Sequence, residues 1–502
     1  MSRSSSSRGK RAGNSEPVEP SFQIIVLGPT GGPREDSVTG ILVRSTSLKW
    51  SPGSVIAVDA GTLLAGVIRL LKLHPPQTKN GVMNKGPFKG LELPHKTAEA
   101  NAAYFFREII GAVFITHPHL DHISGLAINT PILEAGNGPK PVAALPSVLS
   151  AIKNHLFNDV IWPNLSDEDG GAGLLTYQRL VEGGNPRFGS GDRRGYVQAC
   201  NGLLAKCLSV SHGKCKQRYH PESGVHHRAA STAFATEPWM LPPRQLSVEH
   251  TEGFCSPVRS PHLGLGVPGH SQPMMAAVES SAFFLRDNST GDEIIVFGDV
   301  EPDSVSLEPR NWRVWEAAAP KIAAGSLHAF FIECSYSDGI DDAYLYGHLC
   351  PRHLIAELKI LADKVMNVRE GTQSDRKRKL GSASFSEPAS AEVSPRSKRP
   401  NRKSATSEPR SHPPSVDYSG GHVPLGESAG MEVFEAPDPS RWAHSDCLPL
   451  TGLSIYIIHI KETLTDGPPP GERILRELRE HSVAASLGCQ FFLPNPEEGI
   501  WA

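Results

Sequence analysis

The chain has 502 residues, of which 39% are hydrophobic and 21% charged, and its formal net charge is −3 at pH 7. This near balance gives no reason to expect a nucleic-acid-binding surface on the folded part. No stretch reaches the roughly 18 consecutive apolar residues of a membrane-spanning helix, and the serine- and arginine-rich residues 1–13 lack the apolar core of a signal peptide. Eight cysteines without a CxxC pair argue against a disulfide framework or a structural zinc finger and favour an intracellular, cytoplasmic protein.

The first part of the chain alternates short apolar strands with helical patterns. Strands are predicted at residues 22–27, 41–44 and 55–60, and helices at residues 67–73 and 98–109. The turn after the first strand, Gly28 to Pro33, lacks the Lys-Ser/Thr pair of a phosphate-binding loop, and we interpret it as a plain β-turn. This order of elements predicts an α/β fold.

Four metal-competent side chains follow the next apolar strand, at residues 112–115. They are His117, His119, Asp121 and His122. On an extended backbone His117 and His119 lie on one face and can reach a single ion, while Asp121 and His122 turn toward a neighbouring ion. Imidazole and carboxylate ligands without a thiolate favour zinc, with manganese and iron as rivals. The pattern predicts a two-metal hydrolase.

Three later strand ends offer the remaining ligands of a two-metal site. Each of His212, Asp299 and His459 ends an apolar, strand-like run. A single His or Asp at a strand end is more often a hydrogen-bonded residue at a sheet edge. The three residues therefore indicate a metal site only because they occur together. Residues 213–275 show no hydrophobic period and are predicted to be an inserted loop. His270, within that loop, is a competitor for the role of His212.

A polar turn and a histidine-containing string come next. The strand at residues 330–332 ends in Glu333-Cys334-Ser335, and Tyr346-Gly347-His348 leads into a helix predicted at residues 354–365. Glu333, Cys334 and His353 suit capping or core positions. His348 is the better candidate for contact with a substrate or for proton transfer.

The basic charge of the chain is concentrated in one segment. Residues 369–410 hold eleven Lys and Arg against five Asp and Glu, with many Ser and Pro, and we predict a disordered insertion over residues 369–436. Its basic runs fit a nuclear-localisation signal or a solvated loop equally well. A helix at 472–479 and a strand at 490–494 close the chain.

The candidate ligands span His117 to His459, which favours one large domain with long insertions over a row of small domains. We expect a disordered tail at residues 1–20 and a single catalytic domain at residues 21–502.

The HxHxDH pattern resembles that of the metallo-β-lactamase superfamily. The longer string HPHLDHISGL resembles the signature of the class II cyclic-nucleotide phosphodiesterases, the low-affinity cAMP enzymes of fungi, as do the ECS and YGHL strings. The similarity to the family signature is weaker after Leu126, where Ala127 and Thr130 differ from the usual family residues. The resemblance implies an αββα sandwich with long disordered insertions, and two divalent ions, with zinc as first choice, bridged by Asp299. The implied ligands are His117, His119, Asp121, His122, His212, Asp299 and His459.

The resemblance also implies a reaction. A metal-bridged hydroxide would attack the phosphorus of cAMP, or of cGMP, to give a nucleoside 5′-monophosphate and lower cyclic-nucleotide signalling. Asp121 would orient the hydroxide and His348 would protonate the 3′ leaving oxygen. The implied partner is this small molecule, with no stable nucleic-acid partner and no membrane; a homodimer and an additional nuclear location are left open.

Two other classes of function compete with this one. Another hydrolase of the superfamily would be an RNA-processing nuclease, a thioester hydrolase or a lactonase. A nuclease would need a basic surface on the folded core, and thioester hydrolases usually lack the ECS and YGHL strings. A non-catalytic binding relative would be expected to lack metal ligands, yet every expected ligand type has a candidate here.

Overall fold

The computed structural model describes residues 19–76, 81–136, 138–228, 275–382 and 448–502. Most of the described residues form two seven-stranded β-sheets and the helices around them. Within these ranges, no helix is both long and apolar enough to cross a membrane. The residues of the expected 1–20 tail up to 18, most of the expected insertion at 369–436, and His270 lie outside the described ranges.

The first sheet has the strand order β16-β1-β2-β3-β4-β5-β6. Its strands are β1 Phe22–Gly28, β2 Gly40–Ser45, β3 Val55–Val58, β4 Ile110–Phe114, β5 Lys140–Ala144, β6 Leu175–Arg179 and β16 Ile500–Trp501. Strands β1 to β3 pair antiparallel, and β3 to β6 pair parallel. Its helices are α1 Leu64–Leu73, α2 Ala98–Tyr104, α3 Leu120–Asn129 and α4 Pro146–Ala151.

The second sheet has the strand order β15-β14-β13-β12-β11-β8-β7. Its strands are β7 Val197–Cys200, β8 Leu203–Cys215, β11 Ala276–Asp287, β12 Glu293–Phe297, β13 Leu327–Glu333, β14 Ser454–Ile458 and β15 Gln490–Phe492. Strands β12 to β15 pair parallel, and β7, β8, β11 and β12 pair antiparallel. Its helices are α5 Asn311–Ala324, α6 Pro351–Ser382 and α7 Pro470–Ala484.

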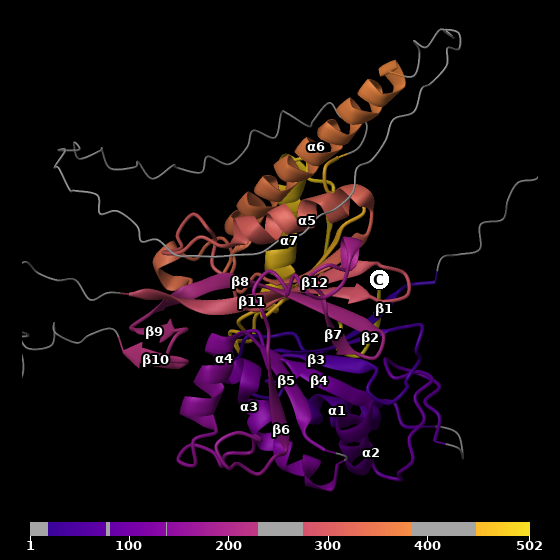
Figure 1. Ribbon diagram of the computed structural model, residues 1–502, viewed down its shortest axis with the longest axis vertical. Coiled ribbons are helices and arrows are strands. Elements are labelled where there is room, and N and C mark those ends of the chain that lie inside the picture. Colours follow the sequence, from indigo (N-terminus) through magenta and orange to yellow (C-terminus); the bar gives the residue numbers. More distant parts are fainter. Residues whose placement is uncertain (1–18, 77–80, 137, 229–274, 383–447) are drawn as a thin grey trace, which may run out of the picture. The chain divides into compact units, whose positions relative to one another are not determined.

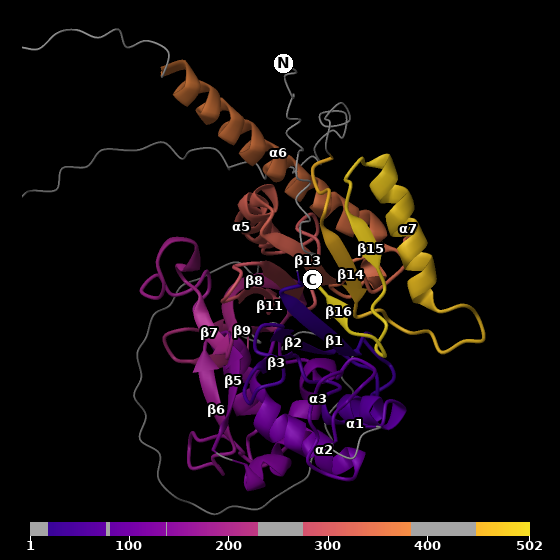
Figure 2. The same cartoon turned by 90° about the vertical axis from the view of Figure 1, so that its right-hand side faces the viewer.

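The two sheets face each other and carry helices on their outer faces, α1 to α4 on the first sheet and α5, α7 and the start of α6 on the second (Figures 1 and 2). The alternation of side chains along β11 explains this packing. Phe283 and Leu285 belong to the core between the sheets, whereas Ala282 and Phe284 belong to the core under α5 to α7. The second sheet is therefore buried on both faces, and the predicted α/β fold, a metallo-β-lactamase-like αββα sandwich, is confirmed.

The prediction of a structureless loop from residue 213 onward is wrong for its first part. Strand β8 continues to Cys215, and β9 Gln217–His220 and β10 Val225–Arg228 form an antiparallel hairpin. The segment is too polar for a hydrophobic period, so tertiary contacts hold it instead. The Ser150 hydroxyl donates to the Gly224 carbonyl at 2.8 Å, and His226 Nε2 lies 2.7 Å from the Ser147 carbonyl oxygen.

Helix α6 is also longer than the predicted 354–365. It runs to Ser382, into the first residues of the expected insertion. That stretch contains no proline and has five Lys and Arg, which are good helix formers, so the helix continues despite Gly371. The described residues outside 369–435 belong to one compact unit.

Candidate metal centre

The predicted ligands lie where strands of both sheets end. His117 follows β4, Asp299 follows β12 and His459 follows β14, while His212 lies near the end of β8. Asp121 and His122 belong to the first turn of α3, for which His119 is the N-cap residue. The carboxyl ends of the parallel strands of the two sheets meet here, so segments far apart in sequence share one site.

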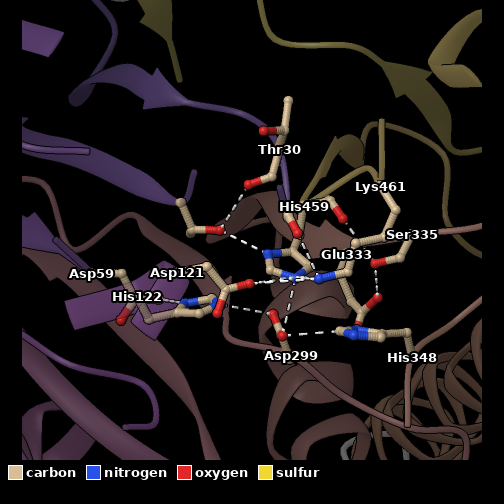
Figure 3. Close-up of polar contacts among 12 residues, drawn as sticks. Thr30, Asp59, Asp121, His122, Asp299, Glu333, Ser335, His348, His459 and Lys461 are labelled. Atoms are coloured by element: carbon tan, nitrogen blue, oxygen red, sulfur yellow. Dashed lines mark hydrogen bonds and ion pairs between the residues drawn. The ribbon is translucent and has the colours of Figure 1, made fainter. Parts of the chain in front are cut away.

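These side chains form two groups that share Asp299. The potential ligand atoms of each group lie within 4.8 Å of one another; one group is His117, His119, His212 and Asp299, and the other is Asp121, His122, Asp299 and His459. The Nε2 atoms of His122 and His459 lie 3.2 and 3.1 Å from the Asp299 carboxylate (Figure 3). His212 Nε2 lies 3.6 Å from the same carboxylate. All seven residues predicted from the sequence therefore come together.

The site contains buried polar atoms that the protein itself does not satisfy. His117 Nε2, His122 Nε2 and Asp299 Oδ1 are buried and have no hydrogen-bond partner. Leaving such atoms unpaired costs on the order of 1–3 kcal/mol each. Imidazole nitrogens and carboxylate oxygens around a shared aspartate suit divalent transition metals, and a bound cation would satisfy these atoms. The residues present thus fit the metal ions that the fold implies.

The opposite nitrogen of three of these imidazoles is held by another group. His122 Nδ1 lies 2.8 Å from Asp59, His212 Nδ1 donates to the Gly347 carbonyl at 2.8 Å, and His459 Nδ1 lies 2.7 Å from the Thr39 hydroxyl. Such contacts fix the ring orientation and leave Nε2 facing the centre. Neither Asp59 nor Thr39 was predicted from the sequence, although Asp59 comes directly after β3 and Asp299 comes two residues after β12.

We predict that Asp59→Asn lowers metal affinity by about 10- to 100-fold, since it removes the anionic partner of His122. Competition with a chromophoric chelator would measure the affinity. The exposed Asp466 offers the control, Asp466→Asn, with unchanged affinity. Equal affinities of the two variants would contradict a role for Asp59 in orienting His122.

Backbone geometry also brings the ligands close together. Asp59 and His459 both have a φ of 57°, a left-handed conformation that non-glycine residues adopt only when the surrounding structure enforces it. A Cβ at Gly31 would lie 2.5 Å from His459 Nε2, and one at Gly61 would lie 1.9 Å from the Asp121 carbonyl oxygen. The turn at Gly28 to Pro33, interpreted from the sequence as a plain turn, therefore forms part of the site wall.

Burial and neighbouring charges set the protonation of the ligands. Burial lowers the pKa of His212 to about 3 and holds the pKa of His117 well below its usual value. Burial would raise the pKa of Asp299, but His459, His122 and His117 hold it well below its usual value. Burial would lower the pKa of His122, but Asp299 and Asp59 raise it well above its usual value, so this imidazole must release its proton when a cation binds, whereas His117 and His212 are already neutral.

A buried carboxyl–imidazole pair lies beside the two groups. His348 Nδ1 is 2.9 Å from Glu333 Oε1 and 3.7 Å from Asp299 Oδ2. Burial, followed by the charge of Asp299, raises the pKa of Glu333 to about 7, while burial lowers the pKa of His348 to about 4. Glu333 also accepts hydrogen bonds from the Val300 amide and the Ser335 hydroxyl. The pair can therefore share one proton near neutral pH.

Other candidates from the sequence have different surroundings. His353 Nδ1 contacts the Cys350 thiol at 3.5 Å, and its Nε2 lies 3.3 Å from Asp342, outside both groups of ligands. Cys334 is fully buried.

Lys461 was not predicted from the sequence. Its ammonium lies 3.5 Å from Asp121 Oδ2 and donates to the Gly31 carbonyl at 2.7 Å. Its only sequence signal is its position two residues after His459.

An αββα sandwich with two overlapping His/Asp groups at its strand ends defines a protein of the metallo-β-lactamase fold with a site for divalent metal ions. The family model of the class-II cAMP phosphodiesterases matches residues 24–375. The chain belongs to this family, as the sequence predicted.

Two curated relatives and one solved structure support this membership. The 3′,5′-cyclic-nucleotide phosphodiesterase of Schizosaccharomyces pombe is 28% identical over 70% of this chain and 78% of its own length. The 3′,5′-cyclic-nucleotide phosphodiesterase 1 of Saccharomyces cerevisiae is 31% identical over 68% of this chain and 82% of its own length. The crystal structure of unliganded yeast PDE1 matches with a TM-score of 0.58 at 19% identity, covering 96% of this chain and 100% of that one, which supports the fold.

Proposed function

We propose that this chain hydrolyses 3′,5′-cyclic nucleotides, with cAMP as the first candidate and cGMP as the second, to nucleoside 5′-monophosphates, and so lowers cyclic-nucleotide signalling. The observation that carries the proposal is the pair of metal-competent groups sharing Asp299, with Glu333 and His348 beside them. Relatives named as 3′,5′-cyclic-nucleotide phosphodiesterases align over two thirds or more of the chain and support the substrate class.

We assign one ion to His117, His119, His212 and Asp299, and the other to Asp121, His122, Asp299 and His459. Zinc is the proposed metal because the set contains histidine and carboxylate but no thiolate, with Mn²⁺ and Fe²⁺ as alternatives. When bound, two such cations lower the pKa of the attacking water and neutralise charge on the phosphoryl oxygens. His212 rather than His270 is proposed as the third histidine of the first ion, on its distance of 3.6 Å from Asp299.

The remaining side chains then have distinct tasks. Asp121 accepts a hydrogen bond from the attacking water and orients it, while Lys461, 3.5 Å away, favours the ionised form of Asp121. His348 passes a proton to the 3′ oxygen as its bond to phosphorus breaks. Glu333 holds that proton beforehand and orients the imidazole through Nδ1.

We also propose an intracellular location, in the cytoplasm, on the chemistry of the thiols. Cys200, Cys207, Cys334 and Cys350 are buried and each occurs as a thiol. Such unpaired cysteines suit a reducing compartment. The nuclear alternative rests only on the basic runs within residues 369–410.

We predict that the purified chain, supplied with Zn²⁺ or Mn²⁺, converts cAMP to 5′-AMP. Chromatographic separation of 5′-AMP from 3′-AMP would measure the product. An excess of chelator is expected to stop the reaction, and returning the metal is expected to restore it, because the attack on phosphorus needs the cations. Robust turnover of a pre-tRNA or a thioester with none of cAMP would refute the proposal, and formation of 3′-AMP would refute the assigned leaving group.

A further inference from the structure

A cavity of about 740 Å³ opens beside the metal centre. The segment Pro118, His119 and Leu120 forms the wall next to the metal ligands. Residues of α4 and of the turn after it, the hairpin β9–β10, and the start of β11 form the others. The volume falls within the range of about 300–1,000 Å³ that is typical of small-molecule sites in proteins.

Two walls of this cavity offer flat or apolar surfaces. Val148, Ala151 and Leu156 line it from the helical side, and Tyr219 and His226 line it from the hairpin. The Tyr219 and His226 rings lie 5.4 Å apart between centroids. The hairpin lies beside α4 (Figure 1) and is fixed to it by the hydrogen bonds described above, so the aromatic wall has a defined position. Aromatic and apolar side chains that line one cavity suit a planar heterocycle.

The charged side chains of the cavity do not suit a phosphate. Arg310 Nη1 lies 3.1 Å from Glu279, and its Nη2 lies 2.6 Å from Glu308. One guanidinium between two carboxylates leaves a net negative charge, which repels a phosphoryl group. Carboxylate oxygens accept hydrogen bonds from N–H groups, such as those on the edge of a purine. The phosphate of a substrate therefore belongs at the cations, and its uncharged part belongs in the cavity.

We infer that this cavity is the nucleoside subsite, with the base stacked on Tyr219 and its polar edge directed to Glu279 and Arg310. The inference rests on the proposed function and adds the residues that recognise the substrate. The β9–β10 hairpin comes directly after β8, the strand that carries His212. With the base stacked on Tyr219, this hairpin decides which phosphodiesters are hydrolysed efficiently.

The test compares cAMP with bis(p-nitrophenyl) phosphate, a diester without a nucleobase. Tyr219→Ala is expected to raise KM for cAMP by roughly tenfold or more, from the loss of base stacking, and to leave turnover of the small diester unchanged. Tyr219→Phe, the matched control, keeps the ring and is expected to keep KM within about twofold of the wild type. Ala151→Phe, which fills the cavity from the α4 side, is expected to have the same selective effect without altering the hairpin.

The possible outcomes distinguish a failure of the nucleoside subsite from a failure of the proposed function. A selective loss with cAMP in both Tyr219→Ala and Ala151→Phe supports the subsite. An unchanged KM for cAMP, or equal losses with both substrates in the two variants, overturns it while leaving the phosphodiesterase reaction in place. A wild-type protein that hydrolyses the small diester but not cAMP overturns the proposed function itself.

Discussion

Replacing Asp299 with alanine is expected to abolish hydrolysis of cAMP, with a loss of about a thousandfold or more, because several kcal/mol of charge stabilisation by the cations would disappear. The physical reason is the position of Asp299 in both groups of potential ligands. The alanine would also leave the buried Nε2 atoms of His117 and His122 without the carboxylate that lies closest to them. Activity and the metal content of the purified protein would be measured together.

The matched comparison is Asp121→Ala. Asp121 belongs to only one of the two groups, so this variant is expected to lose activity while retaining one metal ion per chain, whereas Asp299→Ala loses both. Asp466→Ala, at an exposed position, is the control with normal activity and metal content. Full metal occupancy in Asp299→Ala would contradict a bridging role for Asp299.

The second large effect is expected for His348→Gln. It should lower kcat for cAMP by about 100-fold or more, because the 3′ alkoxide leaves poorly without a proton. Bis(p-nitrophenyl) phosphate releases a stable phenolate that needs no proton, so its hydrolysis should change by less than about threefold. Comparing kcat for the two substrates therefore tests proton transfer rather than general damage to the site.

His353→Gln is a suitable control, since His353 is also largely buried but contacts Cys350 and Asp342 instead of the ligands. It should leave the ratio of the two kcat values unchanged. Equal losses on both substrates in His348→Gln would assign His348 a structural or phosphate-binding role in place of proton transfer.

Local sequence patterns were sufficient to predict a large part of the fold and of the metal site. Histidines and an aspartate at short spacing after an apolar strand identify the metal-binding segment, because the spacing itself holds the side chains near one another. The strands that precede Asp299 and His459 could be recognised from their apolar runs, since β12 is buried along its whole length and β14 is buried or half-buried at every position. The hairpin β9–β10 was missed because it is polar and is held by contacts with α4.

The sequence by itself determined the α/β class, the family and the types of side chain that could bind metal, since these depend on periodicity and on residues near one another in the chain. Only the tertiary structure decided which distant groups meet. Thr39 lies 420 positions from His459, yet its hydroxyl is 2.7 Å from Nδ1 of that histidine. Asp59 orients His122, and Glu333 meets His348 beside Asp299. Such contacts arise where two sheets bring their strand ends together, and spacing along the chain carries no record of them.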